Sequence, residues 1–454
     1  MTASESQRKI GVFSHAGTKN LGDEALLAAV IQNIRARIPN AELTGFTINP
    51  QDTHQRHGIP AFPIRRLDRP STGFVSAESS LPAAPSFSAP LQTPTSAPSR
   101  WKQSMKAVPG LAAALRGFRT FLGIMRGAVL EPKFLLDSYR RLRGVELLLV
   151  AGSQQLNDIY GAWGFPITLF KWMLLARLTG TKVAILSVGA GPISSPFSRF
   201  LIRRVLHMCS YRSYRDAISS KLVESIGVDG PNPVFPDLVY SLQLPSPRPV
   251  PKVAESIVVG VNPVPFYDVR YWATPNAARY HDYVQKFARF AEWLHQNGYS
   301  TLFFPTQARA DILTIQDIRA ELNGKTNSKR MIAGLPIQNL DDLISEIQRA
   351  DLVVANRYHG ILLSLLLNKP VLGIAYHEKS RALLEQAGQG DYVLNIADFS
   401  TEGLIEKIMA LHANSARAKK EIASRIAPLR EALELQYDAV FSLIGIPPSR
   451  PLGN

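Results

Sequence analysis

Cysteine is scarce in this chain, which contains a single one, Cys209, among 454 residues. One cysteine excludes an internal disulfide framework and a thiolate metal cluster, and it fits a reducing compartment. The chain also has no run of about 18 apolar residues, so no membrane-spanning helix is expected. Its polar start, residues 1–9, lacks the apolar core of a signal peptide, and we therefore expect a cytoplasmic protein.

Two common phosphate-binding signatures and any clear metal-ligand cluster are missing as well. The loop at 15–24 has neither the GxGxxG pattern of dinucleotide-binding folds nor the GxxxxGK[ST] pattern of P-loops. His54 and His57 are three residues apart, but they lie in a predicted loop without a partner pair of carboxylates. The sequence therefore predicts no nicotinamide cofactor, no P-loop chemistry and no metal site.

Positive charge is abundant. The chain has 51 Lys and Arg against 36 Asp and Glu, a formal net charge of +15, which indicates acidic partners such as phosphorylated substrates, nucleic acid or an anionic membrane. Nucleic acid is the least favoured, because the basic residues lie outside any predicted groove and lack interleaved aromatic residues. The 46% hydrophobic content suits a globular enzyme, and the length predicts more than one hydrophobic core.

Short buried strands alternate with amphipathic helices along most of the chain. The predicted strands lie at 9–14, 41–48, 145–150, 182–188, 257–261, 301–304, 331–332, 351–356 and 371–375. This alternation predicts an α/β fold with two doubly wound Rossmann-like domains that face each other across a cleft. We expect the first domain at 1–245, the second at 255–410 after a proline-rich hinge, and helices at 411–454 that cross back to the first domain.

Two segments interrupt this pattern. Residues 68–105 are dominated by Pro, Ser and Ala and bury too little apolar surface to fold, so we predict a disordered insertion in the first domain. Residues 105–143 interleave basic and apolar side chains. This segment is either a helix that covers the sheet with its arginines reaching solvent, or a helix that lies on an anionic membrane surface.

The strand at 351–356 is followed directly by Arg357-Tyr358-His359 and then by an apolar helix. Arg357 and His359 therefore lie at the carboxyl end of a strand, where open α/β sheets bind ligands, and at a helix start, which favours anions. A permanent cation beside a group that titrates near neutrality suits proton-coupled chemistry on an anionic substrate. The alternative is a capping arginine beside a buried, hydrogen-bonded histidine.

Several other polar motifs occur along the chain, and most of them follow predicted strands. They are Asn20-Leu21-Gly22-Asp23-Glu24, the small-residue loop from Ala151 through Gly152 to Asp158, Gly189-Ala190-Gly191-Pro192, Arg215-Asp216, Pro236-Asp237 and Tyr376-His377-Glu378-Lys379. With Arg357-Tyr358-His359, these motifs and their order make the chain resemble the polysaccharide pyruvyl transferase family. The motifs span residues 20–379, nearly all of the part that is predicted to fold.

The resemblance implies an enzyme of GT-B-like shape that needs no cofactor. Such an enzyme moves the pyruvyl part of phosphoenolpyruvate onto two hydroxyls of a sugar, forms a pyruvate ketal and releases phosphate. The acceptor would be an exopolysaccharide of the cell envelope or its lipid-linked precursor, held on the side of the first domain, and peripheral contact with the inner face of the cell membrane would run through residues 105–143. The resemblance places Arg357 and Arg215 in the active site, where we expect them to bind substrate. We also expect substrate binding by Asn20, Asp23, Gly152 and Lys379, which lie in the matching motifs.

The same resemblance assigns catalysis to His359 and Asp158. We expect His359 to act as general acid, with its pKa held up by the bound anion, and Asp158 to accept the hydroxyl proton or orient the acceptor. Arg215 and Arg357 would each bind one anionic group of phosphoenolpyruvate in a bidentate way.

The chain departs from the family at Ala151-Gly152-Ser153, where three glycines are usual. Side chains at these positions would crowd a closely approaching ligand. Two alternatives stay open. One is a glycosyltransferase that uses a nucleotide sugar, since the predicted shape is shared. The other is a non-catalytic interaction protein that keeps the fold, which the substitutions at Ala151 and Ser153 favour.

Overall fold

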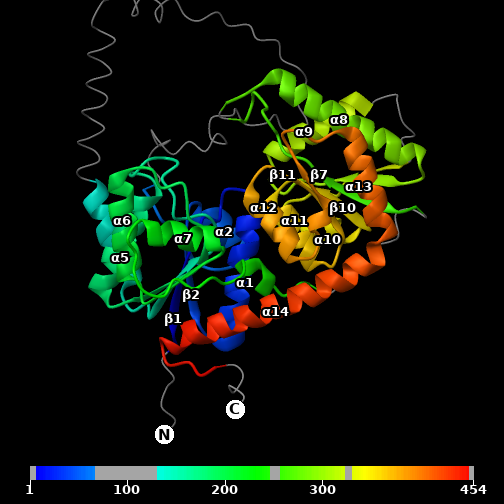
Figure 1. The fold of residues 1–454 in the computed structure, drawn as a ribbon. Coiled ribbons are helices and arrows are strands. Elements are labelled where there is room, and N and C mark those ends of the chain that lie inside the picture. The colour runs from blue at the N-terminus through cyan, green and yellow to red at the C-terminus, as the bar shows by residue number, and fades with distance from the viewer. Residues whose placement is uncertain (1–6, 67–129, 246–255, 273, 323–329, 449–454) are drawn as a thin grey trace, which may run out of the picture.

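The computed structural model describes residues 7–66, 130–245, 256–272, 274–322 and 330–448. It contains two α/β domains, each built on a sheet of six parallel strands (Figure 1). The predicted insertion at 68–105 lies outside the described residues, as does the basic segment 105–143 up to residue 129. Residues 130–142 are helical.

The first domain has its strands in the order β3-β2-β1-β4-β5-β6. The central strand β4 is buried along its whole length, as expected for a parallel sheet that is covered on both faces. The strands are β1 (Lys9–Phe13), β2 (Glu42–Thr47), β3 (Ala61–Pro63), β4 (Leu147–Ala151), β5 (Lys182–Val188) and β6 (Tyr211–Tyr214). The labelled helices are α1 (Leu21–Arg37), α2 (Pro50–His57), α5 (Phe165–Thr179), α6 (Pro196–Met208) and α7 (Ala217–Ser225), followed by the 3₁₀ turn η1 (Leu238–Ser241).

The second domain repeats this plan with the strand order β12-β11-β10-β7-β8-β9. Its strands are β7 (Val258–Asn262), β8 (Ser300–Phe303), β9 (Met331–Ile332), β10 (Leu352–Ala355), β11 (Val371–Ala375) and β12 (Val393–Asn395). Its helices are α8 (Ala277–Gln296), α9 (Ala310–Leu322), α10 (Leu340–Gln348), α11 (Tyr358–Leu366), α12 (Glu378–Gln386) and α13 (Thr401–Ala413), with the 3₁₀ turn η3 (Gly390–Tyr392).

Both sheets therefore have the doubly wound Rossmann order, in which the chain direction across the sheet reverses once. The reversal lies between β1 and β4 in the first domain and between β7 and β10 in the second. The predicted fold class, two Rossmann-like domains, is confirmed. Ligands of such sheets bind beside these reversal points at the carboxyl ends of the strands, which directs attention to the loops after β1, β4, β7 and β10.

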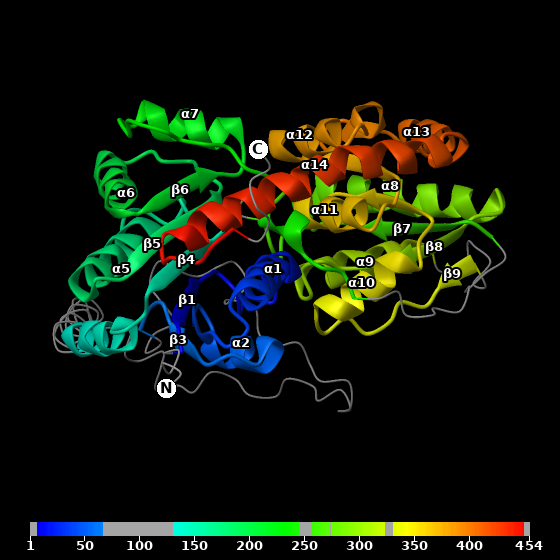
Figure 2. The same cartoon turned by 90° about the horizontal axis from the view of Figure 1, so that it is seen from below.

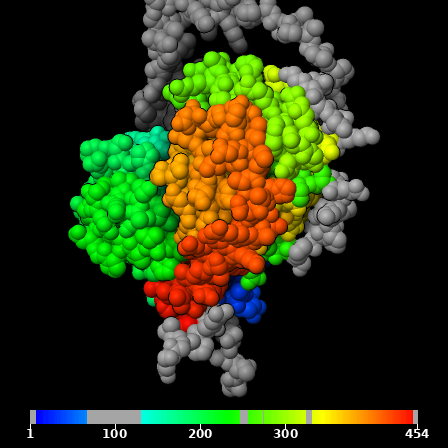
Figure 3. Space-filling view, turned by 45° about the vertical axis from the view of Figure 1, so that its right-hand side comes forward, coloured from blue at the N-terminus to red at the C-terminus, as the bar shows by residue number. Residues whose placement is uncertain are grey.

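The last helix, α14 (Ser415–Ser442), runs along both domains (Figures 1 and 2). Ala418, near its start, packs in the core of the second domain. Near its end, Glu434 and Asp438 accept hydrogen bonds from Arg37 of α1 at 2.6 and 3.1 Å. The helix contains Pro428 between these two anchors. In the space-filling view the two domains meet along one boundary, which α14 crosses at its lower end (Figure 3).

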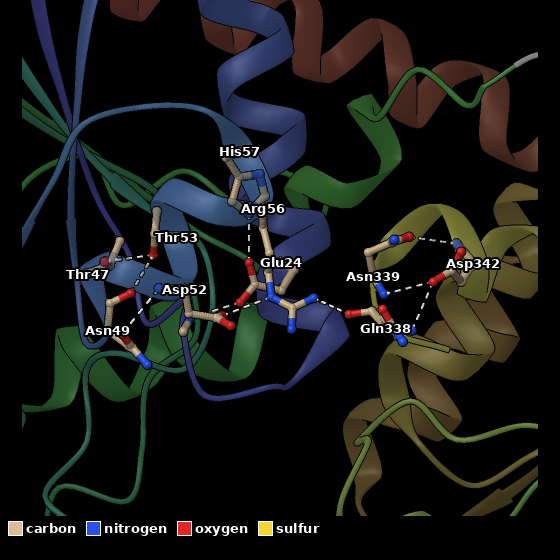
Figure 4. Close-up of polar contacts among 11 residues, drawn as sticks. Glu24, Thr47, Asn49, Asp52, Thr53, Arg56, His57, Gln338, Asn339 and Asp342 are labelled. Atoms are coloured by element: carbon tan, nitrogen blue, oxygen red, sulfur yellow. Dashed lines mark hydrogen bonds and ion pairs between the residues drawn. The ribbon is translucent and has the colours of Figure 1, made fainter. Parts of the chain in front are cut away.

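A second set of polar contacts joins the domains beside α1 (Figure 4). Glu24 of α1 is buried and accepts a hydrogen bond from Nε2 of His57, at the end of α2, at 2.7 Å. The neighbouring Arg56 binds Asp52 through Nε at 2.9 Å and donates from Nη1 to the carbonyl oxygen of Gln338 in the second domain. Helix α2 is thereby joined to α1 in its own domain and to the segment that leads into α10 in the second domain.

Candidate active site

The loops after six strands, three from each sheet, surround one cavity of about 180 Å³ between the domains. The first domain contributes the side chains of Asn20, Asp23, Ser153, Gln154 and Arg215. The second contributes those of Thr306, Gln307, Arg357, Tyr358, His359, Tyr376 and Lys379. The structure thus brings together six of the eight residues that the sequence assigned to the site, and it places Asp158 and Gly152 elsewhere.

The amino ends of helices α1 and α11 meet at this cavity. Asn20 caps α1 and accepts a hydrogen bond from the backbone N–H of Gly22 at 3.1 Å, and α11 begins at Tyr358. A Cβ atom on Gly22 would lie 2.0 Å from Nδ1 of His359, so only glycine permits this approach between the domains. The first N–H groups of α1 already have partners, whereas no side chain caps α11. The positive ends of the two helix dipoles therefore meet at the same space, which favours an anionic ligand.

Arg357 is held by a buried carboxylate. Its Nε and Nη2 atoms both donate to Oδ1 of Asp311, at 3.1 and 2.6 Å, and Asp311 is fully buried. Burial acts against the charged form, but the ion pair with Asp311 raises the pKa of Arg357 above its ordinary value. Asp311 occupies the Nε–Nη2 edge of the guanidinium group, so the donors that remain for a ligand are those of Nη1 and the second N–H of Nη2.

Arg215 lies across the cavity from the second domain's cations and is also nearly buried. Its Nη1 atom is 3.4 Å from Oδ2 of Asp237, and its guanidinium carbon lies 4.9 Å from the centre of the Tyr358 ring. Its Nε atom is buried and has no hydrogen-bond partner among the described residues. Arg215 therefore keeps donor capacity for a ligand while its position is fixed by contacts from both domains.

Burial changes the proton affinity of the two other basic groups. The pKa of His359 is lowered to about 4, so its imidazole is neutral at pH 7 in the protein alone, and its Nε2 is buried without a hydrogen-bond partner among the described residues. Lys379 donates to Oε1 of Gln154 at 3.0 Å, and burial lowers its pKa to about 8. A bound anion would raise the pKa of both groups.

Asp23 is the carboxyl group that faces this cluster. It is buried in the first turn of α1 and accepts a hydrogen bond from Nδ2 of Asn20 at 2.9 Å. Burial raises its pKa to about 6, although hydrogen bonds from Ser153 and Asn20 act in the opposite direction. A carboxyl group with a pKa near neutrality is suited to accept a proton.

The two predicted residues outside the cavity have structural contacts that explain their positions. Asp158 accepts hydrogen bonds from the backbone N–H groups of Ser194 and Ser195, at 2.9 and 2.8 Å. Burial tends to raise its pKa, but these bonds outweigh that effect and lower it. Gly152 has a φ of +44°, and a Cβ atom there would lie 2.7 Å from Cδ2 of Leu26, so this glycine permits close packing between β4 and α1.

The departure from the family's glycine pattern affects the cavity at one position. Ala151 is fully buried in the core beneath the site, and only Ser153 lines the cavity. Ser153 has a φ of 59°, an unusual value for a residue with a side chain. The expected crowding of the ligand by Ala151 does not occur, whereas Ser153 contacts the site through its hydrogen bond to Asp23.

Sequence reasoning missed six of the lining residues: Ser153, Gln154, Thr306, Gln307, Tyr358 and Tyr376. Thr306 and Gln307 were detectable, because they follow β8 at the same carboxyl edge of the sheet that identified Arg357. The backbone N–H of Leu21 also donates to the carbonyl oxygen of Thr306 at 3.2 Å. This contact between the domains had no sequence signal.

Comparison with protein families decides the classification. The model of the polysaccharide pyruvyl transferase family matches residues 20–378, which is most of the chain. The chain belongs to the polysaccharide pyruvyl transferase family. The match includes every residue of the cavity except Lys379, which follows it directly. No curated protein matches the chain at a significant level.

Solved structures show the same overall fold as this pyruvyl transferase family member at low sequence identity. A UDP-GlcNAc 2-epimerase from Neisseria meningitidis bound to UDP-GlcNAc has 11% identity and a TM-score of 0.53, covering 96% of this chain and 100% of that one. A glycosyltransferase from Rickettsia africae has 10% identity and a TM-score of 0.52, covering 96% and 99%. At such identities the likeness establishes the two-domain fold alone.

No group of three or more His, Cys, Asp and Glu side chains that could hold a metal ion occurs in the part of the chain that the structure describes. In that same part, no helix is both long and apolar enough to span a bilayer.

Proposed function

We propose that the protein transfers the pyruvyl group of phosphoenolpyruvate to two hydroxyls of a sugar, with formation of a pyruvate ketal and release of phosphate. The observation that carries the proposal is the convergence of Arg215, Arg357 and Lys379 around His359 in one small cavity. Three cations and two helix amino ends suit a donor that carries both a carboxylate and a phosphate.

Each cation has a different part in donor binding. Arg215 belongs to the first domain and Lys379 to the second, and both lie near the ring of Tyr358. The guanidinium carbon of Arg215 is 4.9 Å from the ring centre, and the ammonium nitrogen of Lys379 is 5.9 Å from it. Binding of one dianion between them would draw the two domains together. Arg357, fixed by Asp311, would contact the second anionic group through Nη1.

The acid in this proposal is His359. The methylene carbon of phosphoenolpyruvate takes a proton and becomes a methyl group, while positive charge develops on the adjacent carbon. The imidazole is neutral before the donor binds, so it takes up its proton together with the anion, whose charge favours the imidazolium form.

The base is better assigned to Asp23 than to the predicted Asp158. Asp23 lines the cavity with a pKa of about 6, whereas Asp158 is engaged by the backbone of Ser194 and Ser195 outside it. Asp23 takes the proton of the attacking sugar hydroxyl as the first carbon–oxygen bond forms. Phosphate then leaves, and the second hydroxyl adds to the same carbon and loses its proton. The two sugar hydroxyls thus lose two protons in all. One proton is matched by the proton that forms the methyl group, and the other is released with phosphate.

The acceptor in this proposal is a sugar of an exopolysaccharide of the cell envelope or of its lipid-linked precursor, and the first domain holds it. We place the reaction in the cytoplasm at the inner face of the cell membrane, in keeping with the single cysteine and the net charge of +15. No cofactor takes part in the proposed steps.

A nucleotide sugar is the alternative donor, since the fold is shared with a glycosyltransferase. The cavity volume of about 180 Å³ argues against it, because pockets for larger ligands usually begin at about 300 Å³. Phosphoenolpyruvate is small enough to be surrounded by the residues that line this space.

Thermal unfolding and calorimetric titration test the donor. Phosphoenolpyruvate is expected to stabilise the protein, whereas UDP and GDP leave its unfolding temperature unchanged. Arg215→Lys is expected to weaken phosphoenolpyruvate binding at least about tenfold. The ammonium group of lysine is a point charge, whereas the guanidinium group of Arg215 can donate two hydrogen bonds and is held in place by Asp237 and Tyr358. Arg309→Lys is the matched control, since Arg309 is exposed and does not line the cavity. Stabilisation by a nucleoside diphosphate alone would reject the proposed donor.

A further inference from the structure

Helices α5 and α6 form an exposed surface on the first domain that none of the steps above uses. They pack side by side on the edge of the molecule away from the second domain (Figures 1 and 2). Both begin at the carboxyl edge of the first sheet, the edge that carries the active-site loops. We call Trp163, Leu178, Phe197 and Phe200, together with the basic residues of the two helices, the α5–α6 surface.

Large apolar side chains on this surface face solvent. Trp163, just before α5, is 78% exposed, and Leu178, near its end, is 71% exposed. Phe197 and Phe200 in the first two turns of α6 are 45% and 43% exposed. The rings of Trp163 and Phe197 lie 6.2 Å apart, so these two exposed aromatic residues form one patch where the two helices begin. Exposed aromatic groups in contact are costly in water and mark interaction sites.

The charge of the α5–α6 surface has one sign. Within the two helices, α5 contains Lys171 and Arg177, α6 contains Arg199, Arg203 and Arg204, and neither helix contains Asp or Glu. The guanidinium carbon of Arg204 lies 5.3 Å from the centre of the Phe200 ring, so cation and aromatic group share one position.

Nearby carboxylates are already engaged. Lys171 is paired with Glu131 of the neighbouring helix, and Asp158 accepts backbone hydrogen bonds at the start of α6. Four arginines, Arg177, Arg199, Arg203 and Arg204, therefore remain to give the surface its positive charge.

We infer that the α5–α6 surface docks the protein on an anionic lipid bilayer. Aromatic residues that enter the headgroup region beside arginines that attract anionic lipids are the combination used by interfacial membrane-binding helices. A second copy of the chain is a poor occupant, because a two-fold interface would bring the same cations against each other. The inference does not depend on the proposed reaction, and it rests on other residues than the basic segment 105–143 that the sequence suggested for membrane contact.

Docking in this orientation has a consequence for the acceptor. The aromatic residues lie at the starts of α5 and α6, at the carboxyl edge of the first sheet, so the bilayer would lie beside the edge that carries the active-site loops of this domain. An acceptor attached to a membrane lipid would then reach the first domain without leaving the bilayer.

Co-sedimentation of the full chain with vesicles tests the inference without any substrate. The protein is expected to bind vesicles of equal parts phosphatidylglycerol and phosphatidylcholine, to be released by salt, and not to bind phosphatidylcholine alone. Replacing Arg203 and Arg204 by Gln is expected to weaken binding about 30-fold, from the contribution of two basic residues at an anionic surface. The double variant Trp163→Ser, Phe197→Ser is expected to weaken binding as well, because it removes the inserted aromatic groups.

Matched controls lie on α14, outside the α5–α6 surface. Arg417→Gln with Lys420→Gln removes two exposed cations of α14, and Leu435→Ser removes an exposed apolar side chain. These controls are expected to bind like the wild type, and unchanged thermal unfolding shows that each variant is folded.

Three results would overturn the inference. One is a wild type that does not prefer anionic vesicles, and another is α5–α6 variants that bind as well as the controls, which would place the contact elsewhere on the chain. The third is light scattering that shows a dimeric wild type and a monomeric Trp163→Ser, Phe197→Ser variant, since the surface would then join two copies.

Discussion

The ionised side chain of Asp23 destabilises the folded protein, although the proposed reaction uses it as a base. Replacing Asp23 by asparagine separates these two effects. Its side chain is 8% exposed, and burial raises its pKa from 3.8 to about 6. This displacement corresponds to about 3 kcal/mol of folding free energy that the ionised carboxylate costs above pH 6. An asparagine at this position would keep an acceptor for the hydrogen bonds from Asn20 and Ser153 without a charge, so Asp23→Asn is expected to be more stable at pH 7 by up to about 3 kcal/mol.

The pH dependence gives the sign of the effect. Below pH 3.8 the carboxyl is protonated in both the folded and the unfolded chain, and it contributes no difference. Between 3.8 and about 6 the folded state binds more protons than the unfolded state, so the wild type loses stability as the pH rises. The stability difference between Asp23→Asn and the wild type should therefore grow across this window and then remain constant up to pH 7.

Urea denaturation at a series of pH values measures this difference. Asp398→Asn, an exposed carboxyl on the second domain, is the control for the change in net charge, and it should show no such trend. Turnover should be lost in Asp23→Asn despite its higher stability, because the amide cannot accept the hydroxyl proton. A difference that stays constant from pH 4 to 7, or a variant that keeps wild-type turnover, would refute the role assigned to Asp23.

Four other predictions concern residues on and beside the cavity. His359→Ala should fold normally and lose at least about a hundredfold in turnover, and wild-type turnover would contradict its role as acid. Donor affinity measured by calorimetry should fall above pH 8 in the wild type as Lys379 loses its proton, but not in Lys379→Arg; a parallel fall in both would exclude this lysine as the cause. Gly22→Ala places a methyl group 2.0 Å from His359 and should cost about 1–3 kcal/mol by thermal unfolding and weaken donor binding, so an unaffected variant would show that the domains do not close there. Asp158→Asn should keep wild-type turnover, and a hundredfold loss would return the role of base to Asp158.

The sequence predicted the order of strands and helices well, because these elements depend on local patterns. Buried apolar runs such as 352–355, followed at once by Arg357 and an apolar helix, reveal a strand, a loop and a helix without any long-range information. The rule that ligands bind after parallel strands identified Arg357 and His359, and the family resemblance added Arg215.

The rest depends on contacts between distant segments. The pKa of Asp23 is raised because the loop after β4 and the second domain bury it, and no local pattern around residue 23 shows this. Asp158 shows the limit of the local pattern. It follows a strand and was therefore predicted to be catalytic, but in the fold its carboxylate accepts hydrogen bonds from the backbone of Ser194 and Ser195. Asp311, which occupies one edge of Arg357, is 46 residues away in sequence and was equally invisible.

Helix α14 has a mechanical consequence for catalysis. Because one continuous helix is anchored in both domains, they cannot swing apart freely, and any opening of the cleft must bend the helix between its anchors. Pro428 lies in that stretch and lacks the N–H that would complete the helical hydrogen bonds there, which makes it the natural pivot. The extent to which the cleft can open is thus limited by α14, a helix that contributes no side chain to the cavity.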